Sequence, residues 1–431
     1  MYVNLGGLIM SVKVIVGAQW GDEGKGKMVD YFAKIADMVV RFQGGDNAGH
    51  TVVNSAGSFK LHIVPCGVFK PNCICFCGTG MVINPDELIS ELGQIEAQSV
   101  STQNVLISSK ATILMPYHIE LDRRSEQGVN AIGSTKRGIG FAYADRARRL
   151  SLRFEDLSDL NYCSERLDAI LPTVNADLKN CNGKPFLKAE LMKKLMQWAS
   201  KLGNKIVEPV TYVNDKINEG KDILFEGQLG VMKDLDLGIY PYVTSSNPVA
   251  AYAAVSAGFS CKKITNIIGI AKAFSSAVGK GPFVTEMPDD EAAIFRGTGE
   301  NVDDEFGART GRARRLGWLD LPVIKYAAMV NGFTELALCK IDKLDNFAEI
   351  KVCVGYKLNG QEIDYMPSTR DQYKVEPIYV TLPGWQTSTV DVRRIRDLPT
   401  NAKKYIELVE KTVKVPIKYV GVGPGRDSIA L

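Results

Sequence analysis

A glycine-rich segment near the N-terminus constrains this chain more than any other feature. Residues 17–27 read Gly-Ala-Gln-Trp-Gly-Asp-Glu-Gly-Lys-Gly-Lys, after an apolar run at 12–16 and before helix-spaced apolar residues at 29–36. A strand, a glycine turn and a helix in this order present backbone N–H groups and a helix N-terminus to an anion. The segment therefore predicts a phosphate-binding loop at the end of a strand.

Two side chains in this loop carry chemistry. Lys25 can reach a phosphate, and Asp22 places a carboxylate where a metal ion or a reacting proton would sit. The spacing differs from a Walker A loop, because six residues separate Gly17 from Gly24 and no hydroxyl residue follows Lys25. The loop favours a nucleotide-binding enzyme over a plain turn.

The composition narrows the class of protein. The chain has 431 residues, of which 45% are hydrophobic and 23% charged, and the net charge of +3 is too small to indicate a nucleic-acid partner. Its apolar runs are too short to span a membrane, and its N-terminus does not read as a secretion signal. Nine cysteines, an odd number, favour reduced thiols, so we expect a cytoplasmic protein. Cys73, Cys75 and Cys77 alternate as on one buried strand face.

Several apolar, strand-like runs each end in a loop rich in glycine and polar residues, with helical patterns between them. This alternation predicts an α/β fold with a large, mostly parallel central sheet covered by helices on both faces. Ligands of such sheets bind at the carboxyl ends of the strands, where these loops fall. We expect one domain over residues 1–431 with an insertion around residues 85–220.

Three further loops are candidate anion sites, and each also has a plain structural interpretation. Residues 43–51 place His50 among glycines, where it suits general acid chemistry or an ordinary turn. Residues 130–140 combine hydroxyls, glycines and basic side chains, as does a solvated surface loop. Residues 241–248 offer Ser246 or Asn247 as a helix N-cap, which would place Thr244 beside a positive helix end.

Two more segments indicate recognition of anions and of a base. Residues 306–315 pack four arginines around glycine and threonine, which suits a loop that closes on a carboxylate or phosphate or an exposed basic loop. Lys340-Ile341-Asp342 follows a strand-like run. A carboxylate there accepts two N–H donors from guanine, which adenine lacks, so the pattern favours GTP over ATP.

Residues 13–427 resemble the adenylosuccinate synthetase family. The motifs that carry the resemblance lie at residues 19–27, 47–51, 240–247, 310–312 and 382–385. The resemblance implies a P-loop-like GTP-binding ligase that joins IMP to L-aspartate through a 6-phosphoryl-IMP intermediate in AMP biosynthesis. It also implies Mg²⁺ as cofactor and a homodimer, without nucleic-acid or membrane partners.

The resemblance assigns roles to residues of this chain. Asp22 would take the proton from the hypoxanthine ring and bind Mg²⁺, to which Gly49 would offer its carbonyl oxygen. His50 would act as the acid in phosphoryl transfer, and Lys25 would neutralise phosphate charge. Residues that would contact IMP are Asp22, Glu23, Gly24, Lys25, Asn47, Ala48, Gly49, His50, Thr135, Gln228, Leu229, Thr244, Arg312 and, from a dimer partner, Arg149.

The other two substrates have their own implied contacts. Residues that would contact GTP are Gly21, Asp22, Glu23, Gly24, Lys25, Gly26, Lys27, Gly49, His50, Thr51, Arg314, Lys340, Ile341, Asp342, Gly421, Val422 and Gly423. Residues that would close on L-aspartate are Ala308, Arg309, Thr310, Gly311, Arg312, Ala313 and Arg314.

The chain departs from the family at a few site positions. Leu229 stands where the family has a glutamine that contacts the purine, and we expect Gln228 to take that role through a backbone shift. Lys136, Phe141, Arg309 and Gly421 also depart from the usual residues. Two alternatives stay open: the same ligation on another 6-oxopurine nucleotide such as a guanylate, and a GTP-binding switch protein.

Overall fold

A ten-stranded sheet forms the centre of the computed structural model, which describes residues 11–431 except 48, 55–56, 129–130, 132, 302–303 and 308–310. Neighbouring strands run parallel, apart from β20, which is antiparallel to β19. In order across the sheet the strands are β20 (Ile429–Ala430), β19 (Ile417–Gly421), β15 (Glu335–Cys339), β11 (Asn266–Lys272), β1 (Val12–Gly17), β10 (Ile223–Gly230), β2 (Met38–Arg41), β5 (Ile74–Cys77), β7 (Val105–Ser108) and β9 (Ile206–Val207).

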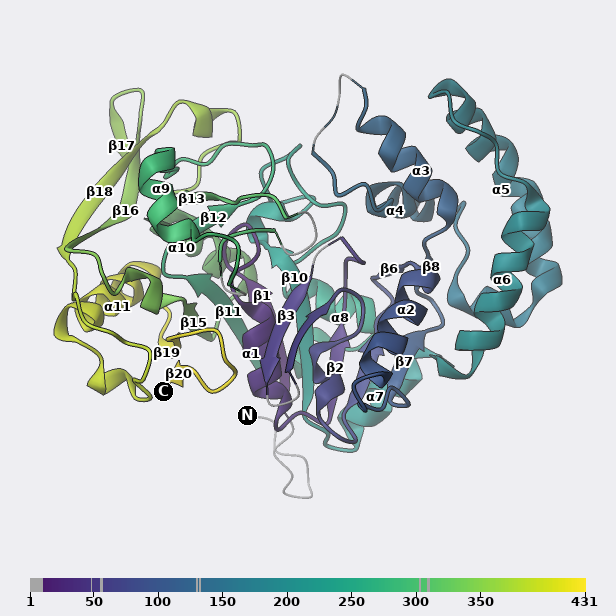
Figure 1. Ribbon diagram of the computed structural model, residues 1–431, viewed down its shortest axis with the longest axis horizontal. Coiled ribbons are helices and arrows are strands. Elements are labelled where there is room, and N and C mark those ends of the chain that lie inside the picture. The colour runs from purple at the N-terminus through teal and green to yellow at the C-terminus, as the bar shows by residue number, and fades with distance from the viewer. Residues whose placement is uncertain are drawn as a thin grey trace.

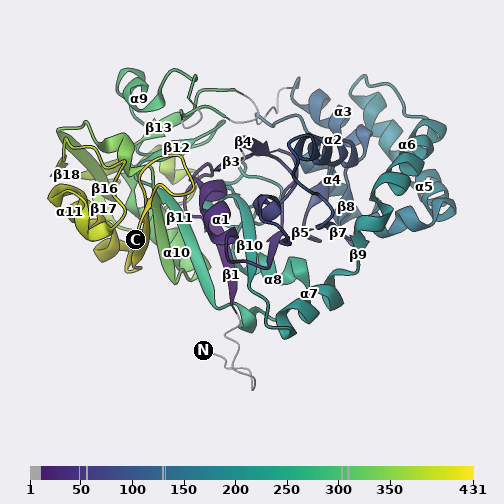
Figure 2. The ribbon, with the colours of Figure 1, turned by 60° about the horizontal axis from the view of Figure 1, so that its bottom comes forward.

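Helices cover this sheet and extend it at one end. Figures 1 and 2 show α5 and α6 at one end of the molecule and α11 with the strands β16–β18 at the other. The helices are α1 (Lys25–Ala33), α2 (Pro85–Glu96), α3 (Pro116–Ser125), α4 (Ile139–Arg148), α5 (Leu160–Asn180), α6 (Lys188–Leu202), α7 (Pro209–Asn218), α8 (Ala251–Ala257), α9 (Asp289–Arg296), α10 (Leu321–Asn331) and α11 (Thr400–Val413). None of the described helices is long and apolar enough to cross a membrane.

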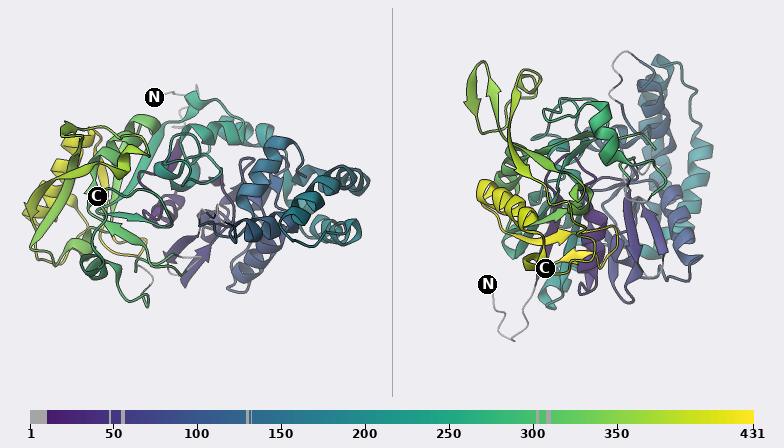
Figure 3. Two further views of the ribbon diagram at one scale, coloured as in Figure 1. Left: turned by 90° about the horizontal axis from the view of Figure 1, so that it is seen from above. Right: turned by 60° about the vertical axis from the view of Figure 1, so that its left-hand side comes forward.

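Smaller sheets surround the central one. The largest of them carries a hairpin that projects from the body of the molecule in the right-hand view of Figure 3. Its strands are β14 (Leu319–Asp320), β16 (Glu349–Leu358), β17 (Gln361–Ile363) and β18 (Glu376–Pro383). Three two-stranded sheets pair β3 (His50–Asn54) with β4 (Gly57–Leu61), β6 (Val82–Ile83) with β8 (Thr112–Ile113), and β12 (Ser275–Ala277) with β13 (Arg315–Gly317).

The predicted strand, turn and helix at the N-terminus are confirmed. β1 is apolar and almost wholly buried between β10 and β11, as expected for a central parallel strand. The chain then turns through Gly24, whose φ of 97° suits glycine, into α1, which buries Val29, Phe32 and Ala33. The phosphate loop therefore lies at the carboxyl end of the middle of the sheet.

Two other local expectations have different outcomes. Cys73, Cys75 and Cys77 are buried at β5, as the alternation predicts. The expected helix cap at Ser246 or Asn247 is wrong, because α8 begins only at Ala251 and has no side-chain cap. The Ser246 hydroxyl instead donates to Gln43 Oε1 at 2.8 Å, a long-range bond that the local sequence pattern does not reveal.

The segment from residue 85 to residue 220 holds α2–α7, most of the extra helical mass in Figure 1. It also contributes β7 and β9 to the central sheet. A single domain with an insertion here stays a prediction. The shared sheet shows only that this segment is built into the core.

Candidate active site

Two neighbouring cavities open at the phosphate loop. Cavity A, of about 540 Å³, is lined by the phosphate loop, Lys340, Asp342, Gly423 and Arg314. Cavity B, of about 550 Å³, is lined from the other side of the loop. Its predicted site residues are Gly21, Asn47, Thr135 and Thr244. The residues that line both cavities are Asp22, Gly49, Leu229 and Gly307.

A buried carboxylate holds the phosphate loop in shape. Glu23 is fully buried, and its Oε1 accepts hydrogen bonds from the backbone N–H of Gln19 at 3.1 Å and of Gly21 at 2.9 Å. A Cβ atom on Gly17 would lie 2.5 Å from this oxygen, so the glycine makes room for the carboxylate. Glu23 also pairs with the ammonium of Lys25, which lines cavity A. Glu23 itself lines neither cavity, so it shapes the loop and orients Lys25.

Asp22 stands where the two cavities meet, in the left-handed region at φ 59°. Its Oδ2 accepts a hydrogen bond from Arg314 Nε at 3.1 Å. Burial raises the pKa of Asp22, but the positive charges of Arg314, Lys272 and Lys25 outweigh burial and bring the pKa below its usual value. Asp22 is therefore an ionised carboxylate at neutral pH, ready to bind a cation or accept a proton.

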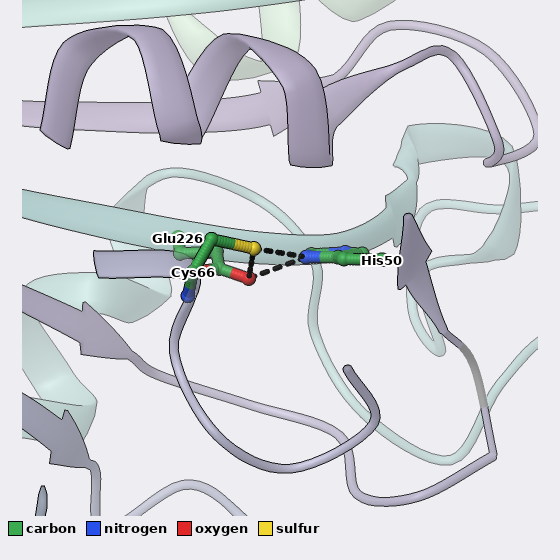
Figure 4. Close-up of side chains that lie close together, drawn as sticks. All are labelled: His50, Cys66 and Glu226. Carbon is green, nitrogen blue, oxygen red and sulfur yellow. Dashed lines mark hydrogen bonds and ion pairs between the residues drawn. The ribbon is translucent and has the colours of Figure 1, made fainter. Parts of the chain in front are cut away.

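His50 lies at the start of β3, and its ring contacts the side chains of Glu226 and Cys66, as Figure 4 shows. Its Nδ1 contacts a carboxylate oxygen of Glu226, from β10. The thiol of Cys66 donates to the same oxygen at 3.2 Å, and the backbone N–H of Cys66 donates to the other oxygen at 2.9 Å. His50 Nε2 is buried without a hydrogen-bond partner among the described residues, and His50 lines cavity A.

The charges around His50 set its protonation. Burial lowers the pKa of His50, and the carboxylate of Glu226 raises it. Burial has the larger effect, so the pKa lies below its ordinary value. Burial likewise raises the pKa of Glu226, but His50 and Arg41 outweigh it, so Glu226 stays ionised. An ionised Glu226 keeps the proton of a neutral imidazole on Nδ1. His50, Cys66 and Glu226 also form the one group of described residues close enough to hold a metal ion.

A second buried carboxylate, Glu305, links the two ends of cavity A. It is fully buried and pairs with Lys272 Nζ at 2.7 Å, Arg314 Nη1 at 2.7 Å and Lys340 Nζ at 2.5 Å. Burial raises its pKa, but the three cations outweigh burial and hold the pKa well below the usual range. Glu305 thus fixes a residue of the predicted guanine site and one of the predicted aspartate loop in one network.

Sequence reasoning did not identify Glu226, Cys66 or Glu305 as site residues. Each belongs to an apolar or mixed stretch without a recognisable motif, and each meets its partners only through the fold. Lys272 could have been found from the sequence, because it is the last residue of the buried strand β11 and the carboxyl ends of central strands lie at the ligand edge of the sheet.

The predicted guanine site is assembled at one end of cavity A. Lys340 directly follows β15, in the left-handed region at φ 62°, and precedes Asp342 in a short 3-10 helix. Lys27 Nζ donates to the carbonyls of Gly423 at 2.6 Å and of Ser428 at 2.7 Å, which ties the C-terminal loop to α1. A Cβ on Gly421 would lie 3.2 Å from this ammonium, so the glycine that departs from the family leaves room for Lys27.

Gln228 and Leu229 take different positions relative to cavity B. Gln228 is fully buried, and its Nε2 donates to Asn47 Oδ1 at 3.0 Å and to the carbonyl of Gly45 at 3.2 Å. Leu229 lines both cavities, with a positive φ of 63°. Gln228 therefore supports Asn47 from beneath, and the side chain that faces the substrate space is apolar.

The remaining predicted residues fall into three groups. Arg149 is exposed at the C-terminal end of α4 and lines neither cavity. Arg312 and Ala313 are exposed, and Gly311 lines cavity A. Ile341 and Val422 are buried behind the cavities. Ala48, Ala308, Arg309 and Thr310 lie outside the described residues, as does the side chain of Thr51.

The chain matches known proteins over nearly its whole length. Residues 14–430 match the family model of adenylosuccinate synthetase. Adenylosuccinate synthetase 1 of Methanosarcina acetivorans is 54% identical over 423 residues, which cover 98% of this chain and all of the relative. The fully ligated adenylosuccinate synthetase of Plasmodium falciparum superposes with a TM-score of 0.91 at 33% identity, covering 98% of this chain and 99% of that one.

A more distant structure shares the fold alone. The succinoaminodeoxyadenylate synthetase of cyanophage S-2L, bound to dGMP and dATP, gives a TM-score of 0.60 at 17% identity and covers 98% of this chain and 95% of that one. The family model, by contrast, spans nearly the whole chain, and the archaeal relative matches it from end to end. The chain therefore belongs to the adenylosuccinate synthetase family.

Proposed function

We propose that the chain joins IMP to L-aspartate with GTP as energy donor, and that the two cavities divide the substrates. GTP occupies cavity A, with its base at Lys340 and Asp342, and IMP occupies cavity B. The observation that carries this assignment is the position of Asp22, which lines both cavities beside a loop built to bind phosphate. A carboxylate at this junction can reach the base of one nucleotide and the terminal phosphate of the other.

The first step transfers a phosphoryl group. Asp22 takes the proton from N1 of the hypoxanthine ring, which leaves negative charge on the 6-oxygen. This oxygen attacks the γ-phosphorus of GTP, the bond to the β-phosphate oxygen breaks, and GDP leaves. Lys25 lies in cavity A to neutralise phosphate charge, since phosphoryl transfer depends chiefly on positioned charge.

His50 supports this step from the opposite wall. Its Nε2 is the unpartnered buried atom, and the entering phosphate dianion raises the pKa of His50, so that Nε2 gains a proton to donate. Glu226 stabilises the imidazolium and fixes the ring. In the second step the amine of L-aspartate attacks C6, and the phosphate, now a good leaving group, departs.

The residues present fit Mg²⁺, which the family uses. Asp22 supplies an ionised carboxylate and Gly49 a backbone carbonyl at the junction of the cavities, and Mg²⁺ prefers such oxygen ligands. The ion, when bound there, would neutralise charge on the GTP phosphates. The asparagine and hydroxyl groups of cavity B would hold IMP, and the arginine loop at residues 306–315 would bind L-aspartate.

We also propose a homodimer in which Arg149 reaches the partner's nucleotide. Arg149 projects from the end of α4 in the left-handed region, exposed and outside both cavities of its own chain. Such a position suits a contact across an interface. We place the enzyme in the cytoplasm, because its nine cysteines are all free thiols.

Omission of each substrate in turn tests the reaction. Release of GDP and phosphate should require IMP, GTP, L-aspartate and Mg²⁺ together, and adenylosuccinate should form in equal amount. Steady GTP hydrolysis without IMP and aspartate would refute the ligase assignment. A reaction in which dGMP or GMP replaces IMP should give no product.

A further inference from the structure

Lys233 is a cation in cavity B that none of the predicted roles uses. It ends the 3-10 helix Val231–Lys233, which directly follows β10 and Leu229. Lys233 lines cavity B together with Asn47, Thr135 and Thr244. Its side chain is half-buried, so the ammonium sits in the wall of the substrate space.

The hydrogen-bonding capacity of this ammonium is largely unused. An ammonium has three N–H donors, and one of them donates to the carbonyl of Tyr242 at 3.0 Å. Among the described residues no carboxylate pairs with Lys233. Burial and, to a lesser extent, the positive charge of Arg315 together lower the pKa of Lys233 to about 8.

The lining of cavity B also contains a donor without an acceptor. Trp20 is 4% exposed and lines cavity B, and its indole Nε1 has no hydrogen-bond partner among the described residues. A buried N–H without a partner costs free energy that a bound acceptor recovers. Lys233 has N–H donors beyond the one that Tyr242 accepts, and the Trp20 indole has no acceptor. This excess of donors in the lining indicates a ligand rich in acceptor oxygens.

The neighbouring backbone points to a phosphate as that acceptor. The carbonyl of Lys233 accepts a hydrogen bond from the backbone N–H of Thr244 at 2.9 Å, so the lysine is anchored to the segment that carries Thr244 and Ser245. Both hydroxyl residues line cavity B. Thr244, Thr135 and Asn47 are neutral, and Arg149 lies outside the cavity of its own chain.

We propose that Lys233 binds the 5′-phosphate of the nucleotide in cavity B and supplies a positive charge for that phosphate from within the same chain. The inference rests on the proposed function, because it takes cavity B as the IMP site. It adds a specificity-determining residue, since a nucleoside without the phosphate would gain nothing from Lys233.

Equilibrium binding of IMP and of inosine to the full chain tests this, measured by calorimetry without GTP or aspartate. Lys233→Met should weaken IMP binding about tenfold or more, the loss expected for one hydrogen bond to a charged group, and leave inosine binding unchanged. Lys233→Arg should retain most of the IMP affinity. Lys216→Met, on a surface lysine of α7 paired with Glu219, is the matched control and should bind IMP as the native chain does.

Each outcome is decisive. Unchanged IMP affinity in Lys233→Met, or equal losses for IMP and inosine, would overturn the inference while adenylosuccinate formation by the native chain upholds the proposed function. A native chain that neither binds IMP nor makes adenylosuccinate would overturn the proposed function itself. Thermal unfolding should find Lys233→Met no less stable than the native chain, and Lys233→Gln repeats the measurement if the methionine variant does not fold.

Discussion

Asp320→Asn should stabilise this protein above pH 7. The substitution removes a buried negative charge and keeps the shape of the side chain. Asp320 is fully buried at the start of α10, where its Oδ1 accepts hydrogen bonds from the hydroxyl of Tyr356 at 2.6 Å and the N–H of Val323 at 3.3 Å. Its Oδ2 has no partner among the described residues. Burial raises the pKa of Asp320 to about 7, against the opposing effect of these two bonds.

The raised pKa fixes the sign and the size of the effect. The folded chain binds the proton more tightly than the unfolded chain, whose aspartate pKa is about 3.9, so the free energy of unfolding falls as pH rises through this range. Between pH 5 and pH 7 the loss from this group is about 2.3 kcal/mol, because the slope of about 1.4 kcal/mol for each pH unit halves as the pH reaches the folded-state pKa. Asparagine resembles the protonated acid, still caps the helix and does not titrate.

Urea unfolding followed by circular dichroism at pH 5, 6, 7 and 8 measures this. The difference in unfolding free energy between Asp320→Asn and the native chain should grow by about 2–3 kcal/mol from pH 5 to pH 8, in favour of the variant. Asp364→Asn, at an exposed aspartate paired with Lys325, is the control and should show no such gain. A difference that stays constant with pH would refute a raised pKa at Asp320.

Four further predictions concern the reaction. Asp22→Asn and His50→Asn should each lower kcat at least about 10²-fold with little change in thermal stability, and near-normal turnover would contradict the acid and base roles. Asp342→Asn should raise KM for GTP. The native enzyme should use GTP far better than ATP, and this preference should be smaller in the variant. Subunits with Arg149→Leu mixed with Asp22→Ala subunits should recover part of the activity, and no recovery after demonstrated subunit exchange would exclude a shared site. Gln228→Ala should raise KM for IMP about 5- to 150-fold by freeing the Asn47 side chain, as a loss of about 1–3 kcal/mol implies, and an unchanged KM would show that Asn47 needs no support from Gln228.

The strand, turn and helix that carry the predicted phosphate loop could be predicted because their determinants are local. Glycines, a buried strand and an amphipathic helix follow one another within about twenty-five residues, and each constrains the next. The same holds for Lys340 and Asp342, which directly follow β15. Their meeting with the phosphate loop follows from one rule, that the carboxyl ends of parallel strands share an edge.

The partners of these residues could not be predicted in the same way. Glu226 reaches His50 across 176 residues of sequence, and Glu305 reaches Lys272 and Lys340 across 33 and 35 residues. No local pattern indicates that a glutamate in an apolar strand will be paired, because only the packed fold brings its cation within reach. The helix cap expected at Ser246 is wrong for the same reason: a hydroxyl that suits a cap locally also suits a distant glutamine, and Gln43 lies closer in the fold.

Leu229 shows what comparison of motifs leaves out at a substrate site. Aligned position by position, the leucine removes a glutamine that would face the purine, and the adjacent Gln228 suggests a simple exchange of roles. In the fold, the end of β10 is irregular: Leu229 lies at φ 63° and the pairing with β1 shifts register between Glu226 and Gly230. Leu229 lines both cavities. The expected contact of Gln228 with the purine stays a prediction, and the structure shows Gln228 bonded to Asn47. If Lys233 binds the phosphate as proposed, this chain holds its nucleotide more by the phosphate than by the base.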